Sequence, residues 1–438
     1  MVSLSPNVKI FLIAGHVSLT GLLYGFDTCS IGVITQMTQF TNSMGRLTST
    51  QQGIYVASIL LSSSVSSLAS GHISDRTSRK YGILLGGIIS LIGTIISAAS
   101  PNFASLIVAR LVTGVGIGQA ISVTTVYLIE MAPVGIRGVA ACFLQTYVVL
   151  GIMVGYFIAF GAHNITGSWA WRVPFVVQAV VAAVLCVGMG VVPFSPRWLV
   201  QVGRADNARR ALSKVRPLTD VERELEEIQQ SLDLEKQQQT ATIREIFNRK
   251  YRGRTALGIF LMAFQQLTGI DVVLYYAPIL FRQAGFTSQR ASFLSSGVTG
   301  IVDRWGRRKP LIYGGALMAV CFIIIGSLYA RYGHTNSDEV GKIYASEIIP
   351  TRLRAKVCAV ELVANWVVNF IVTFTAPLFS QSSSSGPYFL YGFSTVVAVV
   401  VCVLMPETKG HSLEYIERLF ENKGSHEESR PSILSGSA

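Results

Sequence analysis

Two residues of opposite charge, Asp27 and Arg110, interrupt stretches of the sequence that are otherwise apolar. A charged side chain at the centre of a bilayer costs at least about 2.5–3.5 kcal/mol, so such residues are usually paired or line a water-filled cavity. A carboxyl group in this setting commonly binds and releases a proton. We therefore expect Asp27 to carry a proton and Arg110 to be its partner. The alternative is a static pair that only neutralises itself.

A second set of charged residues occurs twice, in the same order, between long apolar stretches. The repeated positions are Asp75, Arg76, Arg79, Glu130 and Arg137 in the first half and Asp303, Arg304, Arg307, Glu347 and Arg354 in the second. Duplicated halves of this kind are typical of transporters that open alternately to each side of a membrane. Because acidic residues recur with the basic ones, we expect ion pairs that form and break as a gate. Alternatively, the basic residues only determine membrane topology.

The elements that must position these residues are membrane-spanning helices. The sequence is 50% hydrophobic and only 14% charged, with a mean hydropathy of +0.48, whereas a soluble domain carries about 25% charged residues. Several runs reach the roughly 20 apolar residues that cross a hydrocarbon core, where only helices or closed barrels satisfy the backbone. Ten spans are predicted, at residues 9–29, 53–73, 81–100, 105–128, 139–160, 171–193, 255–280, 310–330, 356–380 and 387–405. The predicted fold is an all-α integral membrane protein.

The net charge of +12, from 36 basic and 24 acidic residues, does not indicate nucleic-acid binding. The basic residues gather in short loops between spans, and such loops stay on the cytoplasmic side. Both termini are then expected in the cytoplasm. The six cysteines are scattered without metal or redox spacing. No nucleophile–base set or phosphate loop occurs, so no enzyme activity and no cofactor are predicted.

The chain divides into four predicted parts: a six-helix bundle at 1–199, cytoplasmic linker helices at 200–254, a second bundle at 255–405 and a cytoplasmic tail at 406–438. The second bundle is too short. Asp27 and Asp75 are 48 positions apart, but the corresponding Asp271 and Asp303 are only 32 apart. Likewise, Asp75 and Glu130 are 55 positions apart, but the corresponding Asp303 and Glu347 are only 44 apart. Each deficit falls where the first half has a span, so two spans are missing.

Several motifs in order resemble the sugar porter family of the major facilitator superfamily, most closely fungal monosaccharide transporters. Besides the repeated charges, they are Arg110 with Gly114, Gly116 and Gly118; Pro193-Phe-Ser-Pro-Arg-Trp198; Gln265-Gln-Leu-Thr-Gly269; and Pro406-Glu-Thr-Lys-Gly410. Ser78 stands where the family usually has glycine. The resemblance covers nearly the whole chain and implies two bundles with twelve helices, of which this sequence lacks the eighth and tenth.

The resemblance also implies a function: transport of a hexose or pentose by proton symport with alternating access, by a monomer in the plasma membrane. An acidic residue at the Asp27 position goes with proton coupling in that family. A pyranose offers hydroxyls around its rim and C–H groups on its faces, which suit amides and aromatic rings. The expected sugar-binding residues are Tyr24, Gln145, Gln265, Gln266, Asp271, Tyr275, Tyr276, Asn365, Trp366 and Asn369.

Three alternatives stay open at the level of sequence. The solute could be another polyol-like molecule, such as inositol or quinate. The chain could be a sugar receptor that does not transport, although receptors of this family generally carry a long cytoplasmic tail. Finally, loss of two helices would remove two walls of the second bundle, which predicts a transport-defective, truncated product.

Overall fold

The computed structural model describes residues 6–133, 137–237, 247–248, 251–267, 269, 271–272, 275–276, 351–382, 390–391, 393–394, 397 and 401. Every regular element within these residues is an α-helix, which confirms the predicted all-α class. Seven helical stretches in them are long and apolar enough to cross a membrane, at Val8–Ile34, Ser49–Thr77, Arg79–Ala99, Phe103–Met131, Phe143–Ala162, Trp169–Gly188 and Val360–Phe379. They correspond to the first six predicted spans and the ninth.

The remaining predictions on spans fall largely outside the described residues. The span predicted at 310–330 and both missing-helix segments lie in residues 277–350, and most of 387–405 is also outside. The span predicted at 255–280 begins as the helix α13 (Arg252–Leu267). The four-part division of the chain stays a prediction.

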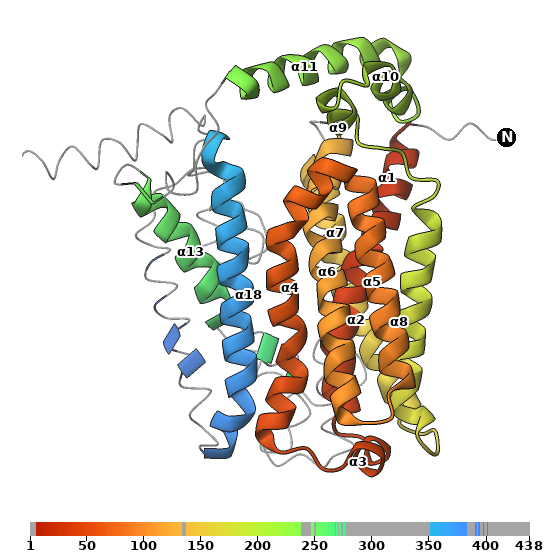
Figure 1. Cartoon of the computed structure of the whole chain (residues 1–438), viewed down its shortest axis with the longest axis vertical. Coiled ribbons are helices and arrows are strands. Elements are labelled where there is room, and N and C mark those ends of the chain that lie inside the picture. Colours follow the sequence, from red (N-terminus) through yellow and green to blue (C-terminus); the bar gives the residue numbers. More distant parts are fainter. Residues whose placement is uncertain are drawn as a thin grey trace, which may run out of the picture. The chain divides into compact units, whose positions relative to one another are not determined.

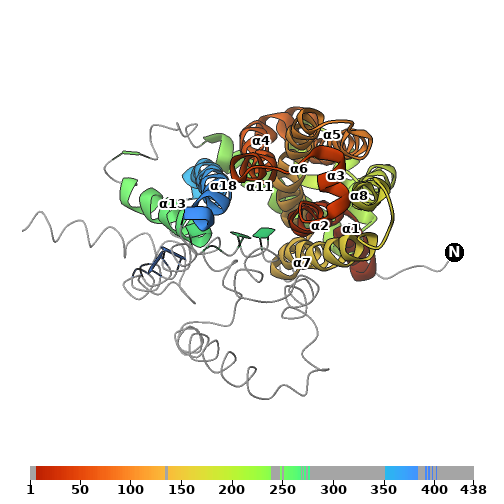
Figure 2. The same ribbon diagram turned by 90° about the horizontal axis from the view of Figure 1, so that it is seen from below.

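The first six spans form one bundle (Figures 1 and 2). The first span is broken between two helices, and a short helix follows it on the loop. The helices are α1 (Pro6–Val17), α2 (Leu19–Ile34), α3 (Thr38–Met44), α4 (Ser49–Thr77), α5 (Arg79–Ala99), α6 (Phe103–Met131), α7 (Arg137–Ala162) and α8 (Trp169–Gly188). Within the bundle α6 packs against both α4 and α5, α2 packs against α7, and α5 packs against α8.

Local sequence sets the ends of these helices. Thr48 and Gln51 form a reciprocal capping box at the start of α4, and the Asn102 side chain accepts a hydrogen bond from the Ser105 N–H at the start of α6. Ser78 joins α4 to α5 with φ at 125°. That backbone region favours glycine, so a residue with a side chain is strained there. The Ser78 hydroxyl accepts from the Tyr81 N–H at 3.2 Å and caps α5.

Small residues let the helices approach closely. A Cβ on Gly25 of α2 would collide with the Val148 carbonyl of α7, so this glycine is required for the packing next to Asp27. On α4, Ser63 and Ser66 donate to the carbonyl oxygens of Gly114 and Val115 on α6, at 2.9 and 2.6 Å. Such small-residue interfaces and hydroxyl hydrogen bonds are the usual means of joining helices in lipid, where burial of apolar surface gives little advantage.

Three helices follow the bundle in the linker: α9 (Pro196–Gln201), α10 (Ala205–Ser213) and α11 (Leu218–Gln237). The last two lie within residues 200–254, where the sequence predicts linker helices. Arg216 attaches the linker to the bundle, because it pairs with Glu224 at 2.6 Å and donates to the Met131 carbonyl at the end of α6 at 3.0 Å.

The described residues divide into two compact units. The first holds α1–α11, residues 266–276 and α18 (Thr351–Ser382) from Leu362 onward; the second holds α13 up to Gln265 and α18 up to Glu361. Every regular element described in either unit is a helix. The buried core of the first contains most of the side chains named below.

Candidate functional site

Asp27 and Arg110 meet inside the first unit. Asp27 of α2 is 3% exposed and Arg110 of α6 is 1% exposed. The Arg110 Nη1 lies 2.5 Å from Asp27 Oδ1 and 2.6 Å from Oδ2. The predicted pairing is therefore present. A pair this deeply buried needs further hydrogen bonds to offset the loss of hydration.

Three neighbouring groups supply those hydrogen bonds. Arg110 Nε donates to the Tyr55 carbonyl and Nη2 donates to the Val56 carbonyl, both on α4 at 3.2 Å. Gln178 of α8 places Nε2 3.5 Å from Asp27 Oδ1 and donates to the Leu23 carbonyl at 3.3 Å. Arg110 thus keeps two backbone acceptors that do not depend on the charge of Asp27.

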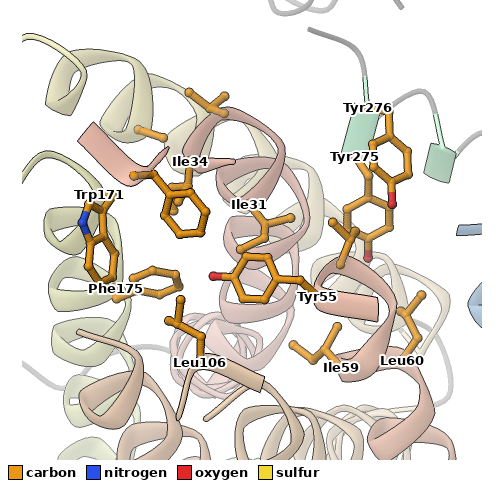
Figure 3. Close-up of a cluster of buried hydrophobic side chains, with 14 of the residues drawn as sticks. Ile31, Ile34, Tyr55, Ile59, Leu60, Leu106, Trp171, Phe175, Tyr275 and Tyr276 are labelled. Atoms are coloured by element: carbon orange, nitrogen blue, oxygen red, sulfur yellow. The ribbon is translucent and has the colours of Figure 1, made fainter. Parts of the chain in front are cut away.

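An aromatic and aliphatic cluster covers one side of the pair. The Tyr55 ring lies 5.5 Å from the Arg110 guanidinium carbon, and Figure 3 shows Tyr55 among Ile31, Leu106 and Phe175. These side chains are buried. They keep the environment apolar, which strengthens the electrostatic interaction within the pair.

A second polar cluster lies along α18 in the first unit. Asn365, Asn369 and Thr373 follow at intervals of four residues, so they share one face of the helix. Gln266 Nε2 lies 3.4 Å from Asn365 Oδ1, and Asn369 Nδ2 donates to Asp271. The structure therefore brings together four of the predicted sugar-binding residues.

Two polar atoms in this cluster are buried and have no hydrogen-bond partner within the described residues: Gln266 Oε1 and Trp366 Nε1. Buried polar atoms are nearly always satisfied, so each exception calls for an explanation. The Trp366 ring meets Tyr24 edge-on, with ring centroids 5.5 Å apart. An acceptor and a donor beside two aromatic faces match what a sugar requires.

The other predicted sugar-binding residues are placed less directly. Tyr276 donates to the Thr373 carbonyl at 3.0 Å and so belongs to the cluster. Tyr275 is buried beside α2, where its carbonyl occupies the space that a Cβ on Gly32 would need. Gln145 on α7 is half-buried, and no hydrogen bond joins it to this cluster among the described residues. Gln265 lies on α13, directly before Gln266.

Arg79 is the centre of the charge network expected in the first half. It pairs with Asp75 at 2.8 Å and with Glu130 at 3.2 Å. Arg79 and Glu130 are both less than 10% exposed as side chains. Arg76 is exposed, and no ion pair links it to the described part of the chain. The side chains of Arg137 and Arg354 lie outside the described residues, as do Asp303, Arg304, Arg307 and Glu347.

The segment before α9 completes this network. Ser195 donates to Glu130 Oε2 at 2.5 Å, and the same hydroxyl accepts from the Trp198 N–H at the start of α9. The Trp198 indole donates to the Asp75 carbonyl at 3.0 Å. The network therefore ties α4, α5, α6 and α9 together at one end of the bundle.

Comparison with known proteins shows to which family the chain belongs. The profile of the family described as "Sugar (and other) transporter" matches residues 13–345 and 338–420. The chain is a sugar porter of the major facilitator superfamily.

Relatives of this porter include sugar symporters from bacteria. The galactose-proton symporter of Escherichia coli (strain K12) is 31% identical over 449 residues, which cover 94% of this chain and 95% of that protein. The arabinose-proton symporter of Bacillus subtilis (strain 168) is 30% identical over 471 residues, which cover 95% of this chain and 98% of that protein. The inward-open structure of the xylose transporter XylE from E. coli superimposes with a TM-score of 0.69 at 26% identity, covering 94% of the porter and 99% of XylE.

Two residues of the candidate sites, Gln178 and Ser195, are not among those expected from the sequence. Gln178 is a lone amide in an otherwise apolar span, a signal comparable to that of Asp27. Ser195 lies within the motif Pro193–Trp198, which was noted without a role. Among the described residues, no group of three or more histidine, cysteine, aspartate or glutamate side chains could hold a metal ion.

Proposed function

We propose that this porter carries a hexose or a pentose across the membrane together with a proton, by alternating access. The observation that carries the proposal is the buried pair of Asp27 and Arg110. Relatives that match nearly the whole chain are named galactose-proton and arabinose-proton symporters, which supports sugar and proton as the co-transported species.

The proton acts on Asp27. A proton from water converts the carboxylate into a neutral acid, and the attraction between the pair is lost. Arg110 stays hydrogen-bonded to the Tyr55 and Val56 carbonyls of α4, so α2 is released from α6 while Arg110 keeps its place on α4. Protonation thereby changes how the helices of the first unit are joined, which is the requirement for coupling.

The sugar binds at the polar cluster of α18. Gln266 Oε1 accepts a hydrogen bond from a sugar hydroxyl, and Trp366 Nε1 donates one, because both atoms are buried without partners in the described residues. Tyr24 and Trp366 offer aromatic faces to the C–H side of the ring. Gln145, Gln265 and Asp271 complete the proposed set.

The Arg79 network serves as the gate at the cytoplasmic surface. Its ion pairs and the Ser195 hydrogen bond hold this end of the bundle together in one state and break in the other. Both termini then lie in the cytoplasm, in line with the positive loops. The functional unit is a monomer in the plasma membrane.

Uptake by purified protein in liposomes tests the proposal. With an imposed inward proton gradient, labelled galactose, glucose, xylose and arabinose are offered separately, and labelled inositol and quinate are offered in the same way as the polyol alternatives. Accumulation of a monosaccharide that collapses when a protonophore is added is the expected result. Accumulation of inositol or quinate alone would assign the porter to the polyol alternative.

A second candidate is sugar binding without transport. The family profile matches in two pieces that meet at residues 338–345, inside the segment where the sequence predicts a missing helix. Measuring equilibrium sugar binding beside uptake separates the two functions. Binding with no uptake supports this second candidate, and robust proton-coupled uptake by the 438-residue chain rejects it.

A further inference from the structure

Besides Asp27 and Glu130, the acidic residue Glu361 is buried, in the membrane-spanning part of α18. It lies at the start of the apolar stretch Val360–Phe379 and is 4% exposed. Its Oε1 atom is buried and receives no hydrogen bond within the described residues. An ionised carboxylate in such a place is costly unless a cation or several donors face it.

The backbone of α13 forms the surface against which this carboxyl lies. A Cβ on Gly258 would collide with Glu361 Oε1, so the carboxyl occupies the space left by the missing side chain. Gly258 lies in the middle of α13 (Arg252–Leu267). Backbone N–H groups at such a position are already bonded to carbonyl groups one turn earlier. The glycine therefore provides space but no hydrogen-bond donor.

The nearest cation in sequence along α13 is Arg254, one helical turn before Gly258 and also buried. Arg254 has an interaction of its own, and Glu361 Oε1 receives no hydrogen bond from it or from any other residue that the structure describes. This differs from Asp27 and Glu130, each of which faces an arginine. Within the described residues, no hydrogen bond therefore stabilises a negative charge on Glu361 Oε1.

Glu361 also continues a pattern. Glu361, Asn365, Asn369 and Thr373 recur at intervals of four residues along α18, so all four share one face of the helix. The last three each have a hydrogen-bond partner in the polar cluster. Glu361 is the first member of this polar stripe and the one that lacks a described partner.

We propose that Glu361 is a second proton-binding residue, separate from Asp27, and that it holds a proton in this conformation. A proton from water adds to one carboxylate oxygen and no other bond changes. The neutral acid removes the cost of a buried charge and leaves an O–H that can donate to water or to a ligand hydroxyl. Proton binding at Glu361 does not depend on whether the chain transports sugar.

Infrared spectroscopy of the full-length protein in liposomes tests this inference at neutral pH. The wild-type chain is expected to show the carbonyl stretching band of a buried protonated carboxyl. Glu361→Gln removes that band, whereas Asp27→Asn leaves it in place. A band that survives in Glu361→Gln, or no such band in the wild type, would overturn the proposal.

Labelling the wild-type protein with glutamate that carries carbon-13 in its side-chain carboxyl provides a test without substitution, should Glu361→Gln fail to fold. The label shifts the band if it belongs to glutamate and leaves it unchanged if it belongs to aspartate. The variant Gly258→Ala presses a methyl group against Glu361 Oε1. It is therefore expected to move the band, and an unmoved band contradicts the placement of the carboxyl.

Discussion

A single nitrogen of Arg110, Nη1, faces both carboxylate oxygens of Asp27, while the other two nitrogens of the guanidinium bind carbonyl oxygens of α4. Arg110 of α6 therefore contacts both α2 and α4, and only its ion pair with Asp27 of α2 depends on a titratable group. A proton on Asp27 removes this ion pair and leaves the two hydrogen bonds to α4. This asymmetry is the physical basis for the proposed coupling.

Asp27→Asn is expected to abolish accumulation of sugar against its gradient, because the amide cannot take up the proton that drives the cycle. Sugar exchange without a proton gradient should persist. Uptake into liposomes with and without an imposed pH difference measures both. Asp206→Asn, on the exposed surface of α10, is the matched control. Unchanged accumulation in Asp27→Asn would contradict the coupling hypothesis.

Arg110→Ala is expected to destabilise the protein strongly, by about 3–5 kcal/mol, because it leaves a buried carboxylate without its partner. The double variant Arg110→Ala with Asp27→Asn should recover part of this loss, since no charge is then left behind. Thermal unfolding of the purified variants in detergent measures the difference. Equal unfolding temperatures for the single and double variants would contradict the role of the pair in stability.

Gln266→Ala should weaken sugar binding by about ten- to a hundredfold, which corresponds to the roughly 1–3 kcal/mol of a buried polar group left unpaired. The loss is expected in affinity, measured by equilibrium binding of labelled sugar. Gln229→Ala on the exposed face of α11 is the control. Normal affinity in Gln266→Ala would place the sugar elsewhere.

Arg79→Gln should lower both the unfolding temperature and the rate of transport, because Glu130 would keep its hydrogen bond with Ser195 but lose its ion pair with Arg79. Arg76→Gln removes the same charge three residues earlier, at an exposed position. It is expected to leave both quantities unchanged if the network acts through specific pairs. Equal effects of the two variants would indicate that only the positive charge of the loop matters.

The sequence alone determined that this protein is helical and membrane-spanning, and to which family it belongs. Lipid offers no hydrogen bonds to the backbone, so length and apolarity of a segment are enough to identify a spanning helix. The spans at 53–73 and 81–100 became α4 and α5 for this reason. The charges Asp27 and Arg110 were recognisable as candidates for a functional role because they are costly where they occur.

Only the tertiary structure decided which of these groups meet. Asp27 and Arg110 are 83 positions apart. Gln178 reaches Asp27 across 151 positions, and Ser195 reaches Glu130 across 65. The rotation of each helix and the depth at which two helices cross depend on small-residue contacts such as Gly25 with Val148. Periodicity in one helix carries no information on those quantities, so the position of Glu361 against Gly258 emerged only from the packed helices.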